Sequence, residues 1–169
     1  MASTSPRNGR RADEPIEVLR LLWANDRDGV SFDGEFFTFA NLCSFPKPHN
    51  ARILPIHVGG STRAAARRAG LRGDGHFVGG AIGKQEQATQ IELMPATARR
   101  AGRDANALEI TCWGSIHVSR EGIEGHAAQG TTRLVVGAAA LDPQQRRDEI
   151  SAFAERVKLR KSTAGPAGG

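Results

Sequence analysis

The chain has 169 residues, of which 39% are hydrophobic and 24% charged, a composition typical of one ordinary globular domain with its own core. No apolar run approaches the ~20 residues of a membrane span, and the N-terminal segment lacks the apolar core of a signal peptide. We therefore expect a cytoplasmic protein without a membrane partner.

The net charge of +5 raises the question of nucleic-acid binding, because a basic face is the usual footprint of contact with a phosphate backbone. The arginines instead stand in pairs on separate helical segments, at 67–68, 99–100 and 146–147, without aromatic residues between them. The chain also has no Tyr for base stacking. Solvated helix faces explain the charge better, and no nucleic-acid partner is expected.

Cysteines and histidines show no metal-binding pattern. Cys43 and Cys112 stand far apart and form no C-x-x-C motif, so both are expected to be packing residues. The five histidines lack ligand spacings such as H-E-x-x-H, and no metal is expected. No Ser-His-Asp, Cys-His or paired-carboxylate set emerges either, so the catalytic residues stay unidentified. Hydride-transfer enzymes need no such set, because the cofactor carries the reaction.

Both ends of the chain, residues 1–11 and 161–169, have little to bury, which predicts disordered tails around one folded domain at 12–160. The first element of that domain is predicted to be a helix. It starts at Asp13, a good N-cap, and ends near Asn25.

A β-hairpin is predicted next, over Val30–Phe39, because the dipeptide Asp33-Gly34 in its middle is a type I′ turn signal. Its inner face is expected to hold one of two phenylalanine pairs, Phe32 with Phe37 or Phe36 with Phe39. Segment 40–50 contains two prolines and is expected to be an irregular loop.

From residue 54 onward a strand and a helix alternate four times. Short apolar strands that alternate with helices indicate parallel βαβ units with right-handed crossovers. Four such units are half of a (β/α)8 barrel, whose usual size is about 250 residues. The predicted strand and helix pairs are 54–58 with 62–71, 75–79 with 84–101, 108–114 with 119–129, and 132–137 with 142–158.

One proline falls inside the second of these helices. Pro95 lacks an N–H group and its ring clashes with the preceding turn, which costs about 3 kcal/mol in an unkinked helix. A kink is therefore expected there.

The first βα connection is the most informative part of the sequence. An apolar run ends in Gly59-Gly60, Ser61 follows as a helix N-cap, and an Ala-rich helix comes next. Glycines let the backbone approach a ligand closely, and the unpaired N–H groups of a helix start favour an anion. The alternative is an ordinary connection that binds nothing.

Glycines recur at the carboxyl ends of the other predicted strands, as Gly79-Gly80, Gly114 and Gly137. In an α/β barrel this end carries the active site, so a cofactor lying across it would need such residues. βα turns also favour glycine for reasons of their own, which leaves both interpretations open on this ground alone.

Five segments, taken in their order and spacing, are more specific than any one of them. They are D-E-P-I-E-V-L-R-L-L-W at 13–23, V-S-F-D-G-E-F-F-T-F at 30–39, F-P-K-P at 45–48, P-I-H-V-G-G-S at 55–61 and G-D-G at 73–75. In these segments the chain resembles the luciferase-like monooxygenase family and its flavin- or deazaflavin-dependent oxidoreductases, over roughly residues 10 to 158.

The resemblance implies an α/β fold that is part of a (β/α)8 barrel. The helix from Asp13 corresponds to the one after the family's fourth strand, and the four βα units correspond to strands five to eight. Strands one to four have no counterpart, which implies a truncated half-barrel. A homodimer of half-barrels, or association with the missing N-terminal half, is the expected consequence.

The resemblance also implies an oxidoreductase that transfers a hydride between a deazaflavin, coenzyme F420, and a small organic substrate. FMN with oxygen insertion is the close alternative, and a catalytically inactive cofactor-binding or assembly fragment is the rival from another class. The implied cofactor-binding residues are Gly59, Gly60, Ser61, Thr62, Gly79 and Gly80.

Three further residues keep two interpretations each. His57 either points into the barrel or is a satisfied core histidine, with the second favoured. Asp74 precedes its strand, so binding a backbone N–H is favoured over a place near the substrate. Trp113 is either a flat wall for a ring system or part of the core.

Overall fold

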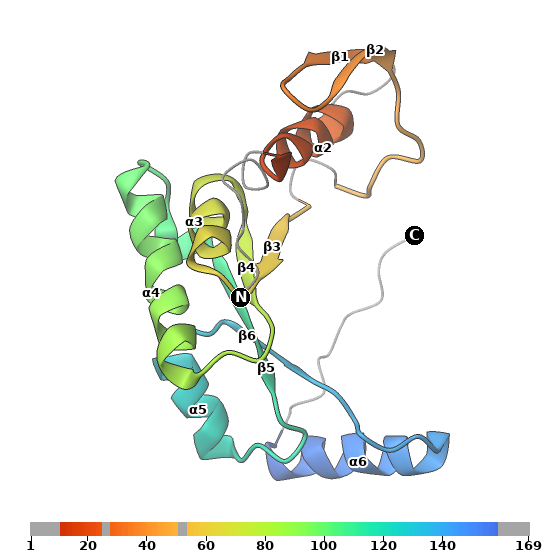
Figure 1. Ribbon diagram of the computed structural model, residues 1–169. Helices are drawn as coiled ribbons and strands as arrows, with labels where there is room; N and C mark the ends of the chain where they lie inside the picture. The colour runs from red at the N-terminus through yellow and green to blue at the C-terminus, as the bar shows by residue number, and fades with distance from the viewer. Residues whose placement is uncertain (1–10, 25–27, 51–53, 159–169) are drawn as a thin grey trace. The chain divides into compact units, whose positions relative to one another are not determined.

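The computed structural model describes residues 11–24, 28–50 and 54–158 (Figure 1). The chain divides into two compact units, Met1–Ile110 and Thr111–Gly169, each of which is described by itself. The predicted tails, 1–11 and 161–169, lie outside the described residues except for Arg11.

The first unit contains a helix, a hairpin and two βα units, and the second continues the same alternation. All four predicted strand and helix pairs are confirmed, although the first strand begins at His57 and not near residue 54. The elements are α2 (Glu14–Ala24), β1 (Val30–Asp33), β2 (Thr38–Leu42), β3 (His57–Gly60), α3 (Arg63–Arg72), β4 (Gly75–Val78), α4 (Lys84–Arg100), the 3-10 helix η1 (Ala105–Ala107), β5 (Glu109–Gly114), α5 (Arg120–Ala128), β6 (Arg133–Val136) and α6 (Pro143–Arg156).

The four strands of the βα units follow the order β3-β4-β5-β6 in one sheet. β3 pairs with β4 in parallel, with His57 opposite Gly75 and Gly60 opposite Val78. β5 pairs with β6 in parallel as well, and Gly114 lies opposite Val136. Strands in sequence order with helical crossovers confirm the predicted α/β class.

The hairpin forms where predicted, but its turn does not. Asp33 stays in the strand opposite Thr38, so residues 34–37 make the turn and the two-residue Asp33-Gly34 prediction is wrong. The cause lies in α2. The carboxylate of Glu14 accepts the backbone N–H groups of residues 35, 36 and 37 at 2.7, 2.9 and 3.0 Å and fixes the wider loop.

The predicted phenylalanine pairs of the hairpin are also wrong. Phe32 stacks on Phe39, with ring centroids 6.0 Å apart and planes inclined by 23°. The two residues are direct partners in the β1–β2 register, and cross-strand neighbours on one face are the side chains that pack together. With the wider turn, Phe32 lies opposite Phe39, and the contact of the two rings follows from this register.

Helices α3 and α4 pack closely against each other in the first unit. Their contact is lined by fully buried small residues, among them Ala66, Ala69 and Ala98. A Cβ placed on Gly70 would lie 2.4 Å from the backbone oxygen of Met94, so only glycine allows this approach. α4 continues without a break through Pro95, the residue after Met94, and Pro95 is half-buried.

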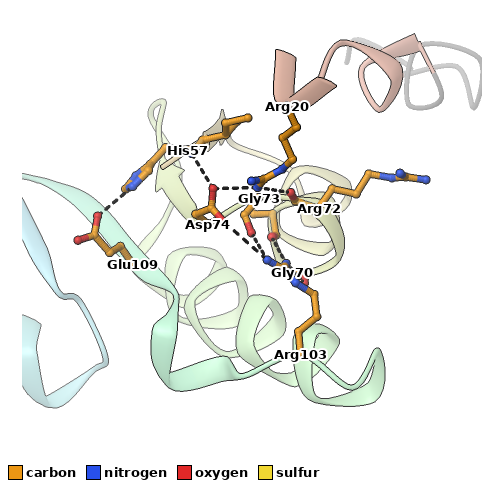
Figure 2. A network of polar contacts seen from close by, with 10 residues as sticks. Arg20, His57, Gly70, Arg72, Gly73, Asp74, Arg103 and Glu109 are labelled. Atoms are coloured by element: carbon orange, nitrogen blue, oxygen red, sulfur yellow. Dashed lines mark hydrogen bonds and ion pairs between the residues drawn. The ribbon is translucent and has the colours of Figure 1, made fainter. Parts of the chain in front are cut away.

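A single residue, Asp74, joins the starts of the strands in the first unit through its carboxylate and its backbone oxygen (Figure 2). Asp74, just before β4, accepts the backbone N–H of Ile56 at 2.8 Å and the guanidinium of Arg20 from α2 at 2.8 Å. Its own backbone oxygen accepts the N–H of Glu109 at the start of β5, at 3.0 Å. The favoured prediction for Asp74, a strand-start carboxylate that binds a backbone N–H, is confirmed.

Two arginines complete this framework. Arg103, after α4, donates to the carbonyl oxygens of Gly70 and Gly73 at 2.6 and 2.7 Å, and so caps the end of α3. Arg20 also donates to the carbonyl of Arg72 at 3.1 Å. A cation near the last carbonyls of a helix interacts favourably with the helix dipole, so α2, α3 and the β4 start are tied at one place.

The second unit has a small apolar cluster of its own. Ile116, Phe153 and Val157 are its buried members, and half-buried residues from α5 and β6 pack around them. Arg156 donates to the carbonyl of Ile116 at 2.9 Å, which ties α6 to the segment after β5. Within the described residues of both units, no helix combines the length and apolarity needed to cross a bilayer.

We expect Pro95→Ala to raise the free energy of unfolding by about 1 to 3 kcal/mol, because alanine restores the missing N–H in a continuous helix. The midpoint of denaturant unfolding measures it. Pro143→Ala is the matched control, since Pro143 stands in the first turn of α6, where proline is tolerated, and its change should stay small. An unchanged midpoint for Pro95→Ala would mean that packing of the ring offsets the lost hydrogen bond.

Asp74→Ala should lower the free energy of unfolding by about 1 to 3 kcal/mol, because it leaves the Ile56 N–H without its acceptor and leaves Arg20 with only the carbonyl of Arg72. Asp74→Asn keeps an oxygen for the N–H and loses only the charge, so its effect should be smaller and should shrink in high salt. Denaturant unfolding with and without added salt tests both. Equal losses for the two variants would contradict this account.

Candidate functional site

The structure brings together two glycine-rich connections at the carboxyl ends of β3 and β4. The backbone N–H of Gly79 donates to the carbonyl oxygen of Gly60 at 3.2 Å. Since the two strands are parallel neighbours, the starts of α3 and α4 lie at the same edge of the sheet. All six predicted cofactor-binding residues belong to these two connections.

Backbone geometry explains the glycines at two of these positions. Gly60 and Gly80 have φ angles of +149° and +84°, which other residues rarely adopt. A Cβ on Gly60 would lie 2.8 Å from the Cβ of Ala65, and one on Gly80 would lie 3.1 Å from the Cβ of Ser61. The ideal Cβ position of Gly59 has no atom within 4 Å, so open space adjoins the backbone there.

The N-cap of α3 is Thr62, and the prediction of Ser61 is wrong. The hydroxyl of Thr62 accepts the N–H of Ala65 at 3.2 Å, and its backbone is extended, as an N-cap requires. Ser61 is exposed and lies one residue further out, against Gly80. Ser and Thr can both cap a helix, so the backbone path and not the residue type decides which of the two does so here.

An ion pair bridges the first turns of α3 and α4. Arg63, the first residue of α3, donates from Nη2 to Glu86 Oε2 at 2.9 Å and from Nε to both carboxylate oxygens at 3.2 Å. This hydrogen bond, followed by one from Gln90, lowers the pKa of the Glu86 carboxyl. The pair therefore persists as pH falls, until the pH passes below that lowered pKa.

A buried polar chain supports Glu86, and sequence reasoning missed it. Gln90 donates to Glu86 Oε1 at 3.2 Å, and its own carbonyl oxygen lies 3.3 Å from Nε2 of His76. His76 Nδ1 lies 2.8 Å from the backbone oxygen of Val58. His76 and Gln90 are both fully buried. The available signal was weak: a histidine inside an apolar strand and a glutamine one turn after a glutamate.

His57 lies at the opposite end of the same strands. Its Nε2 is 2.9 Å from Glu109 Oε2, and its ring crosses Gly75 of β4, where a Cβ would lie 2.6 Å from the ring. His57 is half-buried and faces a carboxylate, so the favoured prediction of a satisfied core histidine is wrong. Its neighbour Glu109 could not be predicted because β4 separates the two strands. Trp113 has 55% of its surface exposed and is not a core residue.

A pocket of about 330 Å³ also opens at this end of the strands, beside Asp74. Two of its guanidinium groups, those of Arg20 and Arg103, are held by Asp74 and by carbonyl oxygens at the end of α3, as Figure 2 shows. It lies away from the glycine connections. No three His, Cys, Asp or Glu side chains among the described residues gather as they would around a metal ion.

Comparison with known proteins identifies the family. Residues 2–124, well over half of the chain, match the family described as luciferase-like monooxygenase. The chain belongs to this family, and the resemblance predicted from the five sequence segments is confirmed.

Curated relatives match the chain over part of their length. An F420-dependent glucose-6-phosphate dehydrogenase of Nocardia farcinica is 31% identical over 102 residues, which are 59% of this chain and 29% of that protein. An uncharacterized protein of Mycobacterium bovis is 27% identical over 145 residues, 82% of this chain and 42% of that protein. The chain thus spans less than half the length of these relatives.

Solved structures share the fold. An F420-dependent secondary alcohol dehydrogenase matches with a TM-score of 0.73 at 18% identity, over 95% of this chain and 64% of its own. The F420-dependent tetrahydromethanopterin reductase of Methanopyrus kandleri matches with a TM-score of 0.70 at 11% identity, again over 64% of that chain. A long-chain alkane monooxygenase matches with a TM-score of 0.53 at 15% identity. The predicted partial barrel is confirmed as a fold.

The N-cap assignment predicts different effects for neighbouring hydroxyls. Thr62→Ala should lower the free energy of unfolding by about 1 kcal/mol, because the N–H of Ala65 loses its acceptor. Ser61→Ala, the matched control, should change it by less than about 0.5 kcal/mol. Denaturant unfolding of both variants measures the difference, and a larger loss for Ser61→Ala would restore Ser61 as the cap.

Proposed function

We propose that this chain forms the phosphate-binding part of the cofactor site in a luciferase-like oxidoreductase that transfers a hydride to or from a small organic substrate. The proposed cofactor is the deazaflavin F420, with FMN as the alternative. The observation that carries the proposal is the junction of the two glycine connections, where Gly79 binds Gly60 beside the start of α3. The cofactor class is supported by an F420-dependent relative found by sequence and by an F420-dependent enzyme of similar structure.

The geometry of the junction fits such a group. Open space adjoins Gly59, while Gly60 and Gly80 leave no room for side chains, so backbone atoms form the surface that a ligand meets. A helix start adds N–H groups and a favourable dipole for a phosphate. Gly59, Gly60, Ser61, Thr62, Gly79 and Gly80 are the residues proposed to hold it, with the Thr62 hydroxyl already engaged in the cap.

The cofactor, when bound, would supply the hydride chemistry. This chain's own residues would bind its phosphate through backbone N–H groups and, by fixing that end, orient the ring at the carboxyl ends of the strands. In α/β barrels these ends are where the chemistry takes place. The side chains that contact the substrate would come from elsewhere in a complete barrel, which is why no catalytic residue is proposed.

The rival proposal is a catalytically inactive cofactor-binding or assembly fragment. Four parallel strands leave two strand edges to be paired, by a second copy of the chain or by a segment equivalent to the family's first four strands. Turnover of F420 with candidate alcohols or sugar phosphates would favour the enzyme. Binding without turnover, with a dimer in solution, would favour the fragment. A cytoplasmic location is part of the first proposal.

We expect Gly60→Val to abolish cofactor binding, because a side chain there clashes with Ala65 and obstructs the phosphate. Fluorescence titration of purified protein with F420 and with FMN measures it. Gly102→Val is the matched control, since Gly102 also has a positive φ, +72°, and no atom lies within 4 Å of its ideal Cβ position. Unaltered affinity of the Gly60 variant, with its circular dichroism intact, would place the phosphate elsewhere.

A further inference from the structure

The pocket beside Asp74 combines charged and apolar walls in a space of about 330 Å³. Its walls come from α2, from the end of α3, and from Asp74 and Arg103, all within the first unit. The volume lies at the small end of the range usual for sites that bind small molecules. The pocket adjoins the amino ends of the strands, whereas the proposed cofactor site lies at their carboxyl ends. It is therefore a second candidate site.

Two guanidinium groups share one carboxylate in this pocket. Figure 2 shows Arg20 and Arg103 approaching Asp74 from opposite directions. Oδ2 of Asp74 lies 2.8 Å from Nη2 of Arg20, and Oδ1 lies 3.9 Å from Nη2 of Arg103. Oδ2 also accepts the backbone N–H of Ile56 at 2.8 Å. Two positive charges thus face one negative charge, and that carboxylate is partly committed to the backbone.

The other charged residues in and around the wall compensate one another. Nη1 of Arg72 donates to Oε1 of Glu17, and Figure 2 shows the Arg72 side chain pointing away from Asp74. Asp13, the next carboxylate, lies 2.6 Å from Arg68 and 3.9 Å from Arg72. One positive charge therefore remains in excess, and it belongs to the cluster of Arg20, Asp74 and Arg103.

Both arginines of this cluster keep N–H groups that a ligand can use. Arg20 donates through Nη2 alone, to Asp74 and to the carbonyl of Arg72, and Arg103 donates through Nη1 and Nη2. Within residues 11–24, 28–50 and 54–158, no hydrogen bond engages Nε of either arginine or Nη1 of Arg20. The carbonyl oxygens at the end of α3, which disfavour an anion, are already bound by these arginines.

The rest of the wall selects the kind of anion. Ile16 is buried and Leu71 is 50% exposed, and together they give the pocket an apolar side for a hydrocarbon group. One excess positive charge matches a singly charged anion, whereas a second negative charge would meet Asp74 and Glu17 without a cation to balance it. A carboxylate accepts strong hydrogen bonds from guanidinium groups and carries a single charge.

We propose that this pocket binds a small organic monocarboxylate. Its carboxylate lies at the Arg20 and Arg103 guanidinium groups, and its hydrocarbon part lies against Ile16 and Leu71. Since the pocket is formed by α2, the end of α3 and the segment before β4, the bound carboxylate stabilises the first unit by mass action. The inference does not depend on the proposed cofactor site.

The test uses the purified full chain, labelled with 15N, and three probes: butyrate, its uncharged isostere butyramide, and the dianion sulfate. Butyrate should shift the amide signals of Leu71 and Asp74 in a saturable way, and butyramide should bind about tenfold more weakly. Equal affinities for butyrate and butyramide would overturn the inference, because they would show an apolar hollow without an anion site. Absence of butyrate binding would overturn it as well, and tighter binding of sulfate would overturn the assignment to a monocarboxylate.

Two substitutions in the wall should change butyrate affinity in opposite directions. Leu71→Glu should weaken it about tenfold, because the new carboxylate cancels the excess charge, and Glu17→Gln should strengthen it about threefold, because a carboxylate leaves the wall. Leu141→Glu, at a residue 90% exposed in the second unit, and Glu92→Gln, at an exposed residue of α4, are the matched controls. Equal effects of a wall variant and its control would attribute the change to net charge and overturn the inference. Glu17→Gln keeps the test decisive if Leu71→Glu fails to fold.

Discussion

The first unit depends on one carboxylate. Asp74 receives a backbone N–H from the residue before β3 and a guanidinium from α2, while its backbone oxygen receives the N–H that begins β5. Parallel strands have no hairpin to fix their stagger. The Asp74 carboxylate holds the residue before β3, and a separate acceptor, the Asp74 backbone oxygen, holds the start of β5. With the starts fixed, strands of equal length end at the same edge, which brings the glycine connections of β3 and β4 into contact.

The two ends of the sheet consequently use different interactions. At the amino ends, charged side chains hold the framework: Arg20 on Asp74, Arg103 on the end of α3, and His57 on Glu109 across Gly75. At the carboxyl ends of β3 and β4, glycine backbone forms the surface. Side chains at the first end stabilise the fold. The second end, where glycine backbone adjoins the Arg63–Glu86 pair, is the one at which we propose that the cofactor binds.

Sequence patterns predicted what depends on local composition and missed what depends on distant partners. The four strand and helix pairs follow from hydrophobic runs that end in glycines. The same pattern predicted that the glycines lie at the carboxyl ends of the strands. The hairpin turn was mispredicted because Glu14, about twenty residues away, supplies the acceptor that widens it. The Glu109 partner of His57 and the Gln90 support of Glu86 likewise join residues whose proximity exists only after the sheet and helices have packed.

The surroundings of the positive charges likewise depend on contacts between distant residues. The chain carries a net +5, yet the arginine nearest the proposed phosphate site is matched by a carboxylate that two buried polar residues hold in place. Burying His76 and Gln90 costs desolvation unless their polar atoms are partnered. Both ring nitrogens of His76 face acceptor oxygens, of Val58 and of Gln90, and a ring with one N–H donates to one of them. The Arg63–Glu86 pair itself is exposed, and such pairs contribute only about 0 to 1 kcal/mol to stability. The position of Glu86 is therefore set mainly by the buried residues beneath it.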